Sequence, residues 1–111
     1  MPWTIESALS HQSIENPCKL ITEYQFALRD IPIVITIKLY QPINGNKVWF
    51  NQSHFIKTPT QMGPYMTSRP WNDDEASALH QVVSGFTQYY EDAVKQGHSP
   101  DASWLIPNKN F

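Results

Sequence analysis

The sequence has a single cysteine, Cys18, only two arginines and no long hydrophobic run. One cysteine excludes a disulfide within the chain and is typical of a reducing compartment, so we expect a cytoplasmic protein. No apolar run approaches the roughly 20 residues that a membrane-spanning helix needs. The opening MPWTIESALS also lacks the basic-then-apolar layout of a signal peptide. We therefore expect no membrane segment and no leader.

Charge of either sign is scarce, because Lys, Arg, Asp and Glu make up only 16% of the chain. A formal net charge of −2 offers no large positive field for a phosphate backbone. The acidic run Asn72-Asp73-Asp74-Glu75 adds to this, so duplex nucleic acid is not an expected partner. The chain has 111 residues, of which 41% are hydrophobic. This length predicts one domain over 1–111 with a core of its own.

Two neighbouring segments, 18–28 and 31–41, alternate apolar and polar residues with the period of two that is typical of a strand. A two-residue turn between them pairs Tyr24 with Ile35 and Leu20 with Leu39. In that register the apolar faces of both segments coincide, and a slip by one residue would expose them. The pattern therefore predicts an antiparallel hairpin.

A third strand is predicted over 47–57. The preceding Asn44-Gly45 is the strongest short hairpin signal in the sequence, because both residue types tolerate positive φ. Two registers remain open. A two-residue turn directs Phe50, Gln52, His54 and Ile56 toward the core, whereas a bulged turn directs Trp49, Asn51, Ser53 and Phe55 there; we favour the first. The centre of the segment is polar on both faces, which predicts an edge strand that water can reach.

One long helix is predicted over 73–96, because the apolar residues of this segment fall on one half of a helical circumference. Asn72 is placed to cap its start and Gly97 to end it. Gly85 lies at the apolar edge and indicates a close approach of the helix backbone to the sheet. Before the strands, Thr4 predicts a short helix or an irregular segment. The expected fold is thus α+β, a three-stranded antiparallel meander packed on one long helix.

One helix leaves the second face of such a sheet without a cover. Three strands at about 4.8 Å spacing make a sheet about 14 Å wide, which one helix about 10 Å across largely covers. The second face carries aromatic and apolar side chains in the favoured register, and contiguous apolar surface often marks an interaction site. The N-terminal segment, the 58–71 loop or another molecule could lie over it. The candidate partner-binding residues are Val34, Tyr40, Trp49, Asn51 and Phe55.

The long 58–71 loop supplies a second set of candidates, because loops of this length are often functional. His54, Tyr65, Arg69 and Trp71 would line a ligand pocket between this loop and the sheet, where a guanidinium suits an anionic group. The sequence shows no zinc-ligand spacing, no glycine-rich phosphate loop and no nucleophile motif. We therefore expect no metal, no cofactor and no catalytic residues, and we lean against an enzyme.

Three functional hypotheses follow. The leading one is a small non-catalytic interaction or regulatory protein that binds a protein partner or a second copy of itself through the outer sheet face and the 58–71 loop. The first alternative is a small-molecule binder or unorthodox enzyme with a pocket between loop and sheet. The second is a single-stranded nucleic-acid binder in which bases stack on sheet aromatics.

Overall fold

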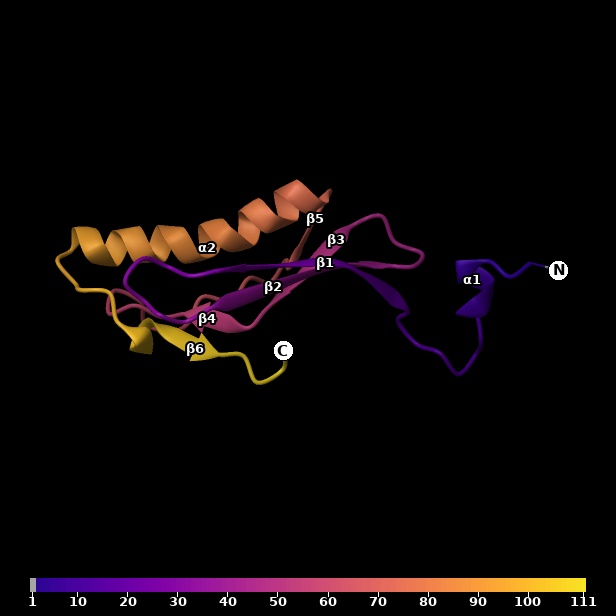
Figure 1. Cartoon of the computed structure of the whole chain (residues 1–111), viewed down its shortest axis with the longest axis horizontal. Helices are drawn as coiled ribbons and strands as arrows, with labels where there is room; N and C mark the ends of the chain where they lie inside the picture. The colour runs from indigo at the N-terminus through magenta and orange to yellow at the C-terminus, as the bar shows by residue number, and fades with distance from the viewer. Residues whose placement is uncertain (1) are drawn as a thin grey trace.

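The computed structural model describes residues 2–111 and has an α+β fold (Figure 1). In chain order the elements are α1 (Ile5–Ala8), β1 (Cys18–Phe26), β2 (Ile35–Pro42), β3 (Val48–Gln52), β4 (His54–Ile56), β5 (Trp71–Asn72), α2 (Glu75–Lys95), the 3-10 turn η1 (Ala102–Trp104) and β6 (Leu105–Pro107). The main sheet has the strand order β1-β2-β3-β5, and β4 and β6 form a second, two-stranded sheet. The predicted combination of an antiparallel sheet, one long helix and a short N-terminal helix is confirmed.

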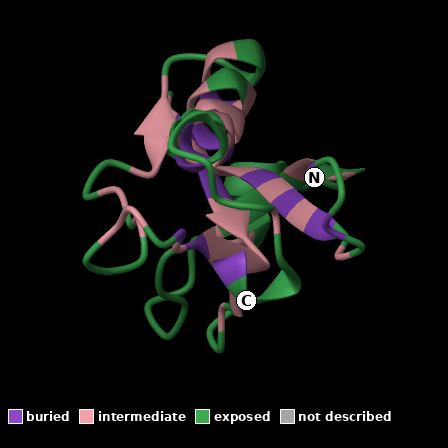
Figure 2. Ribbon diagram, turned by 90° about the vertical axis from the view of Figure 1, so that its left-hand side faces the viewer, coloured by how far each residue is buried: buried purple, intermediate pink, exposed green. Residues whose placement is uncertain are grey.

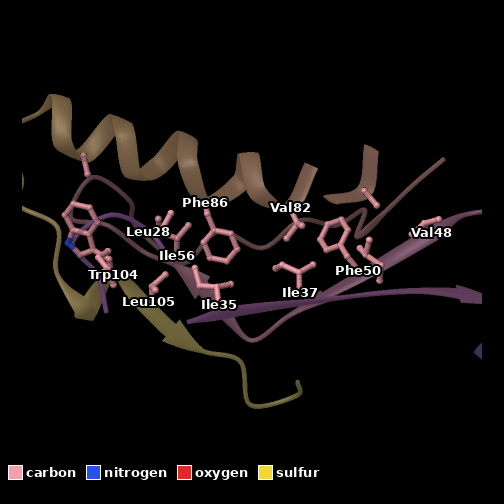
Figure 3. Close-up of a cluster of buried hydrophobic side chains, with 14 residues drawn as sticks. Leu28, Ile35, Ile37, Val48, Phe50, Ile56, Val82, Phe86, Trp104 and Leu105 are labelled. Atoms are coloured by element: carbon pink, nitrogen blue, oxygen red, sulfur yellow. The ribbon is translucent and has the colours of Figure 1, made fainter. Parts of the chain in front are cut away.

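Helix α2 lies along one face of the main sheet, and the core fills the space between them (Figures 1 and 2). Alternate residues of β2, namely Ile35, Ile37 and Leu39, are fully buried beneath the helix. Figure 3 shows Ile35 and Ile37 in one cluster with Val82 and Phe86 of α2, and Leu39 belongs to the same cluster. Trp104 and Leu105 extend the same cluster past the end of the main sheet. The core therefore joins both sheets to a single helix.

Both helices begin at side-chain caps. Thr4 caps α1 through a reciprocal pair of hydrogen bonds with Ser7, as its sequence position predicts, but the helix makes only one turn. The N-cap of α2 is Asp74, whose Oδ1 accepts the Ser77 N–H at 2.7 Å, so the predicted cap at Asn72 was two residues early. At the other end Gly97 adopts a φ of 90°, the left-handed stop that the sequence predicts.

The turn between β1 and β2 is wider than predicted. Strand β2 begins at Ile35, and Tyr24 pairs with Ile37 instead of Ile35. Pro32 has no N–H to donate to a sheet, and the chain around it forms local turns in which the Ile31 N–H donates to the Leu28 carbonyl at 3.1 Å. The register moves by two residues, so Tyr24 keeps the face that the alternation predicts.

A β-bulge in β1 moves Leu20 to the face opposite α2. The register shifts between Leu20 and Thr22, so that Leu20 pairs with Tyr40 instead of the predicted Leu39. One extra residue reverses the alternation of a strand beyond the bulge. As a result Leu20, predicted to be in the core, is 54% exposed.

The favoured register between β2 and β3 is confirmed, but the turn that joins them is not the predicted one. Leu39 pairs with Phe50, and this pairing places the Phe50 ring on the core face. The turn closes where the Gly45 N–H donates to the Pro42 carbonyl at 3.0 Å. Neither Asn44 nor Gly45 has a positive φ. A longer loop therefore replaces the expected two-residue turn and preserves its register.

The predicted third strand is two strands that meet at Ser53, where the chain passes from one sheet to the other. We call Asn51–His54 the polar corner. Its backbone and side chains are bound from two sides: Ser53 Oγ accepts the Thr36 N–H at 2.8 Å, and the Ser53 carbonyl accepts the Asn108 N–H at 2.8 Å. Asn108 Nδ2 donates to the Gln52 carbonyl at 2.7 Å. The prediction of a water-exposed edge strand was therefore wrong, because protein groups satisfy these polar residues.

Asn108→Ala tests how much the polar corner contributes to stability. The substitution leaves the partly buried Gln52 carbonyl without its side-chain donor, so we expect the free energy of unfolding to fall by about 1–3 kcal/mol. Urea denaturation measures the change, with the exposed Lys109→Ala as the control. Equal stabilities of the two variants would contradict the role of the corner.

Gly85 is buried where α2 contacts the 58–71 segment, and not where it approaches the sheet as predicted. A Cβ at this position would lie 2.9 Å from Cε2 of Tyr65. The Tyr65 ring also packs against Tyr89, at 5.1 Å between centroids. Gly85 thus provides the space in which this segment docks on the helix.

A double-mutant cycle tests this explanation of Gly85. In the wild-type background we expect Gly85→Ala to be destabilising, because the new methyl group collides with the Tyr65 ring. In a Tyr65→Ser background the collision is absent, and the same substitution should stabilise the protein by about 1 kcal/mol through helix propensity. Chemical denaturation gives both values, and the same sign in both backgrounds would rule out the Tyr65 contact as the cause.

Candidate functional site

A row of four large side chains crosses the main sheet on the face opposite α2. Leu20 pairs with Tyr40, Tyr40 pairs with Trp49, and Trp49 pairs with Trp71. Residues that pair in antiparallel strands share one face of the sheet. These four therefore form a continuous row, which we call the outer ladder. Leu20 is 54% exposed and the three rings are half-buried.

The sequence identifies only half of the outer ladder. Tyr40 and Trp49 belong to the predicted partner-binding set, and their cross-strand pairing is confirmed. Leu20 was missed because the bulge that turns it outward has no periodic signal. Trp71 was placed in a loop, but the two-residue β5 joins it to β3, and its ring centroid lies 6.3 Å from that of Trp49.

Two cations lie at the Trp71 end of the ladder. The Arg69 guanidinium is 4.5 Å from the Trp71 ring centroid, and the Lys47 ammonium is 5.4 Å from it. Both distances are typical of cation–π contacts. Lys47 also forms an ion pair with Asp73. This end of the ladder therefore carries a positive charge that Asp73 only partly balances.

The C-terminal segment lies over part of this sheet face, and it is a cover that the sequence did not indicate. The Lys38 ammonium lies 4.5 Å from the Phe111 ring centroid, and Asn108 Nδ2 donates to Asn51 Oδ1 at 3.2 Å. Figure 1 shows this segment on the side of the sheet away from α2, whereas α1 lies beyond the end of the sheet. The C-terminal segment thus covers the part of the face around Lys38 and Asn51, while Glu23 and Gln25 of β1 stay exposed.

A cleft of about 370 Å³ lies between this sheet face and the 58–71 segment. Three of the predicted partner-binding residues line it, namely Tyr40, Asn51 and Phe55, together with Met66, Thr67 and Pro70 of the segment and with Phe50 and Gln52. Val34 lies apart, in the turn before β2. The favoured register of a continuous third strand would place Val34 opposite Phe55. That placement was wrong, because the polar corner takes Phe55 into β4, where it pairs with Ile106.

The four predicted ligand-binding residues lie in three places. Arg69 and Trp71 are in contact at the end of the ladder. Tyr65 packs on α2 and lines an open groove of about 680 Å³ with uncharged polar side chains of that helix. His54 lies in the polar corner, with Nδ1 2.8 Å from Ser53 Oγ. The four residues therefore do not line one common pocket between the loop and the sheet.

Two titratable groups near this face have shifted pKa values. Burial raises the pKa of the Tyr40 phenol, and the neighbouring Cys18 adds to the increase. Burial lowers the pKa of His54, because the charged imidazolium loses hydration there. At neutral pH both side chains are therefore uncharged.

Within residues 2–111, no helix has the length and apolar character to cross a bilayer. Nor does this part of the chain bring three His, Cys, Asp or Glu side chains together in a group that could hold a metal ion.

Comparisons with known proteins do not assign a family. A scan against protein-family models, a search of curated proteins and a search of solved structures each give no match to this chain. The outer ladder and the adjoining cleft are therefore the observations from which a function is inferred.

The lowered pKa of His54 predicts a pH dependence of stability. The unfolded chain binds a proton at this residue near pH 6.5, and the folded protein does so only at lower pH. The contribution of neutral His54 is therefore complete above about pH 6.5 and is lost as the pH falls toward the folded pKa. We expect His54→Asn to lose less thermal stability than wild type between about pH 7.5 and pH 5.

The control for this measurement is His80→Asn, which changes an exposed histidine of α2. It should retain the wild-type pH profile of the melting temperature. A wild-type profile in His54→Asn would show that another group causes the pH dependence.

Proposed function

We propose that this protein is a small non-catalytic interaction module that binds a protein partner through its outer sheet face. The observation that carries the proposal is the outer ladder, four side chains in register across four strands. Helix α2 covers the opposite face, and the C-terminal segment stops short of the ladder. Aromatic residues and Arg are the types that protein interfaces enrich at their cores.

The geometry favours a protein over other ligands. Rings held on paired strands are already ordered, so a partner that packs on them pays little additional conformational entropy. The cleft beside Tyr40 adds a concave site in which Phe55 and Met66 can receive an apolar side chain. A flat aromatic row next to a cleft of about 370 Å³ suits a peptide segment with one anchoring residue.

Single-stranded nucleic acid is a second candidate, favoured by the two cations beside Trp71. Bases stack on aromatic rings, and Lys47 or Arg69 can contact a phosphate. The charge distribution supports this candidate less well, because Lys47 is paired with Asp73 and two further acids follow at the start of α2.

Selection from a phage-displayed random peptide library tests the proposal. Selected peptides are measured by fluorescence polarisation against wild type, Trp49→Ser and Leu20→Glu. We expect each ladder variant to weaken binding at least tenfold, since central interface rings contribute about 2 kcal/mol or more. Leu20 is exposed, so we expect Leu20→Glu to retain the fold. This variant keeps the test valid if Trp49→Ser unfolds the protein.

Val94→Ser is the matched control, because Val94 is an exposed apolar residue on α2, away from the ladder. It should leave peptide affinity within about twofold of wild type. Peptides that bind both ladder variants as well as wild type would refute the proposal. Tight binding of a labelled oligothymidine that falls steeply between about 50 and 200 mM salt would instead assign the ladder to nucleic acid.

A further inference from the structure

The N-terminal segment, residues 2–16, extends away from the body of the protein, and we call it the N-terminal arm. The molecule measures 64 × 25 × 23 Å, whereas the 21 residues of α2 span only about 32 Å at 1.5 Å per residue. Figure 1 shows α1 beyond the end of the sheet, along the longest dimension. The arm therefore accounts for much of the elongated shape.

The arm presents apolar side chains that its own chain does not cover. Trp3 is 82% exposed, Ile5 is 66% exposed and Ile14 is 41% exposed. The hydrogen bonds of residues 4–14 in the structure join residues of the arm to one another. A single helical turn is not stable in water by itself, and packing against another surface is what normally holds one in place. The arm thus exposes three large apolar side chains and does not pack them on the body of the protein.

The outer ladder has the complementary deficiency and lies at the same end of the molecule. The Pro17 carbonyl accepts the Ile43 N–H at 2.9 Å, which anchors the base of the arm beside the β2–β3 hairpin. Leu20, the first residue of the ladder, follows three residues later.

We propose that the outer ladder binds the N-terminal arm of a second copy of this chain, and that two copies exchange arms around a twofold axis. This inference rests on the proposed function of the ladder and names its occupant. A twofold axis places the arm of each copy over the ladder of the other. The dimer then has two equivalent contacts, and each of them buries the apolar side chains of one arm and of one ladder. The ladder spans three strand spacings, about 14 Å, which the arm can readily cross.

Sedimentation equilibrium of the full chain tests the exchange. The arm variant is Trp3→Ser with Ile5→Ser, the ladder variant is Leu20→Glu, and Val94→Ser is the control. We expect wild type and the control to be dimeric, and each of the first two variants to raise the dimer dissociation constant at least tenfold. Both changes are at exposed positions, and circular dichroism verifies that the fold is retained.

Mixing the two weakened variants distinguishes arm exchange from other modes of dimerisation. The ladder variant keeps an intact arm, and the arm variant keeps an intact ladder, so one of the two arm contacts can form in the mixed dimer. We expect the mixture to associate at least threefold more tightly than either variant alone. No gain on mixing overturns the exchange, as does a dimer that the arm variant leaves unchanged.

The remaining outcomes separate this inference from the proposed function. A monomeric wild type whose ladder still binds the selected peptides overturns the exchange and leaves the interaction module standing. A monomeric wild type in which Trp3 is protected from a solvent quencher, and in which no peptide binds the ladder, shows that the arm covers its own ladder and overturns both.

Discussion

The structure depends on one constraint, which is that the backbone polar groups at Ser53 must be satisfied where the chain changes sheets. A strand that leaves its sheet within the fold exposes donors and acceptors that water would otherwise bind. Here Thr36 of β2 and Asn108 of the C-terminal segment supply the missing partners. The change of direction at Ser53 then brings Ile56 under the far end of α2, where it is 1% exposed.

The same corner determines where a partner could bind. Because Asn108 is fixed at the corner, the C-terminal segment runs over the outer face and brings Phe111 against Lys38. The cover ends there. Two further departures from regular structure complete the outer ladder, since the bulge in β1 turns Leu20 outward and the short β5 adds Trp71. The outer ladder is thus assembled from irregularities of the sheet as much as from its regular alternation.

The α+β class and the long helix could be predicted from the sequence, because apolar periodicity determines both. The pairing of Leu39 with Phe50 was the favoured one of two registers that the sequence left open. Periodicity could not determine the register of Tyr24, since a shift of two residues preserves every face. It also carries no signal for a bulge or for a two-residue strand. The break at Ser53 depends on Asn108, which is 55 residues away in sequence. The strand pattern shows only that the residues around Ser53 are polar.

The candidate site was predictable to the same extent. Tyr40 and Trp49 follow from the register of two neighbouring strands, and both lie in the outer ladder. Phe55 was predicted on the outer sheet face. It lies in β4 instead, but it lines the cleft that adjoins the outer ladder. Arg69 and Trp71 were assigned to a pocket because a loop has no periodicity that assigns its side chains to a sheet face. In the structure Trp71 pairs with Trp49, and Arg69 lies over the Trp71 ring at the end of the ladder.

Strand β1 is held mainly by its pairing with β2. None of its residues is buried, and although Phe26 packs edge-on against Phe86, α2 lies mainly over β2, β3 and β5. Segments with few buried contacts open locally at a lower free energy than global unfolding requires. The amides of β1 should then exchange with solvent while those of β2 stay protected. The arm and its strand could thus detach together from a core that remains intact.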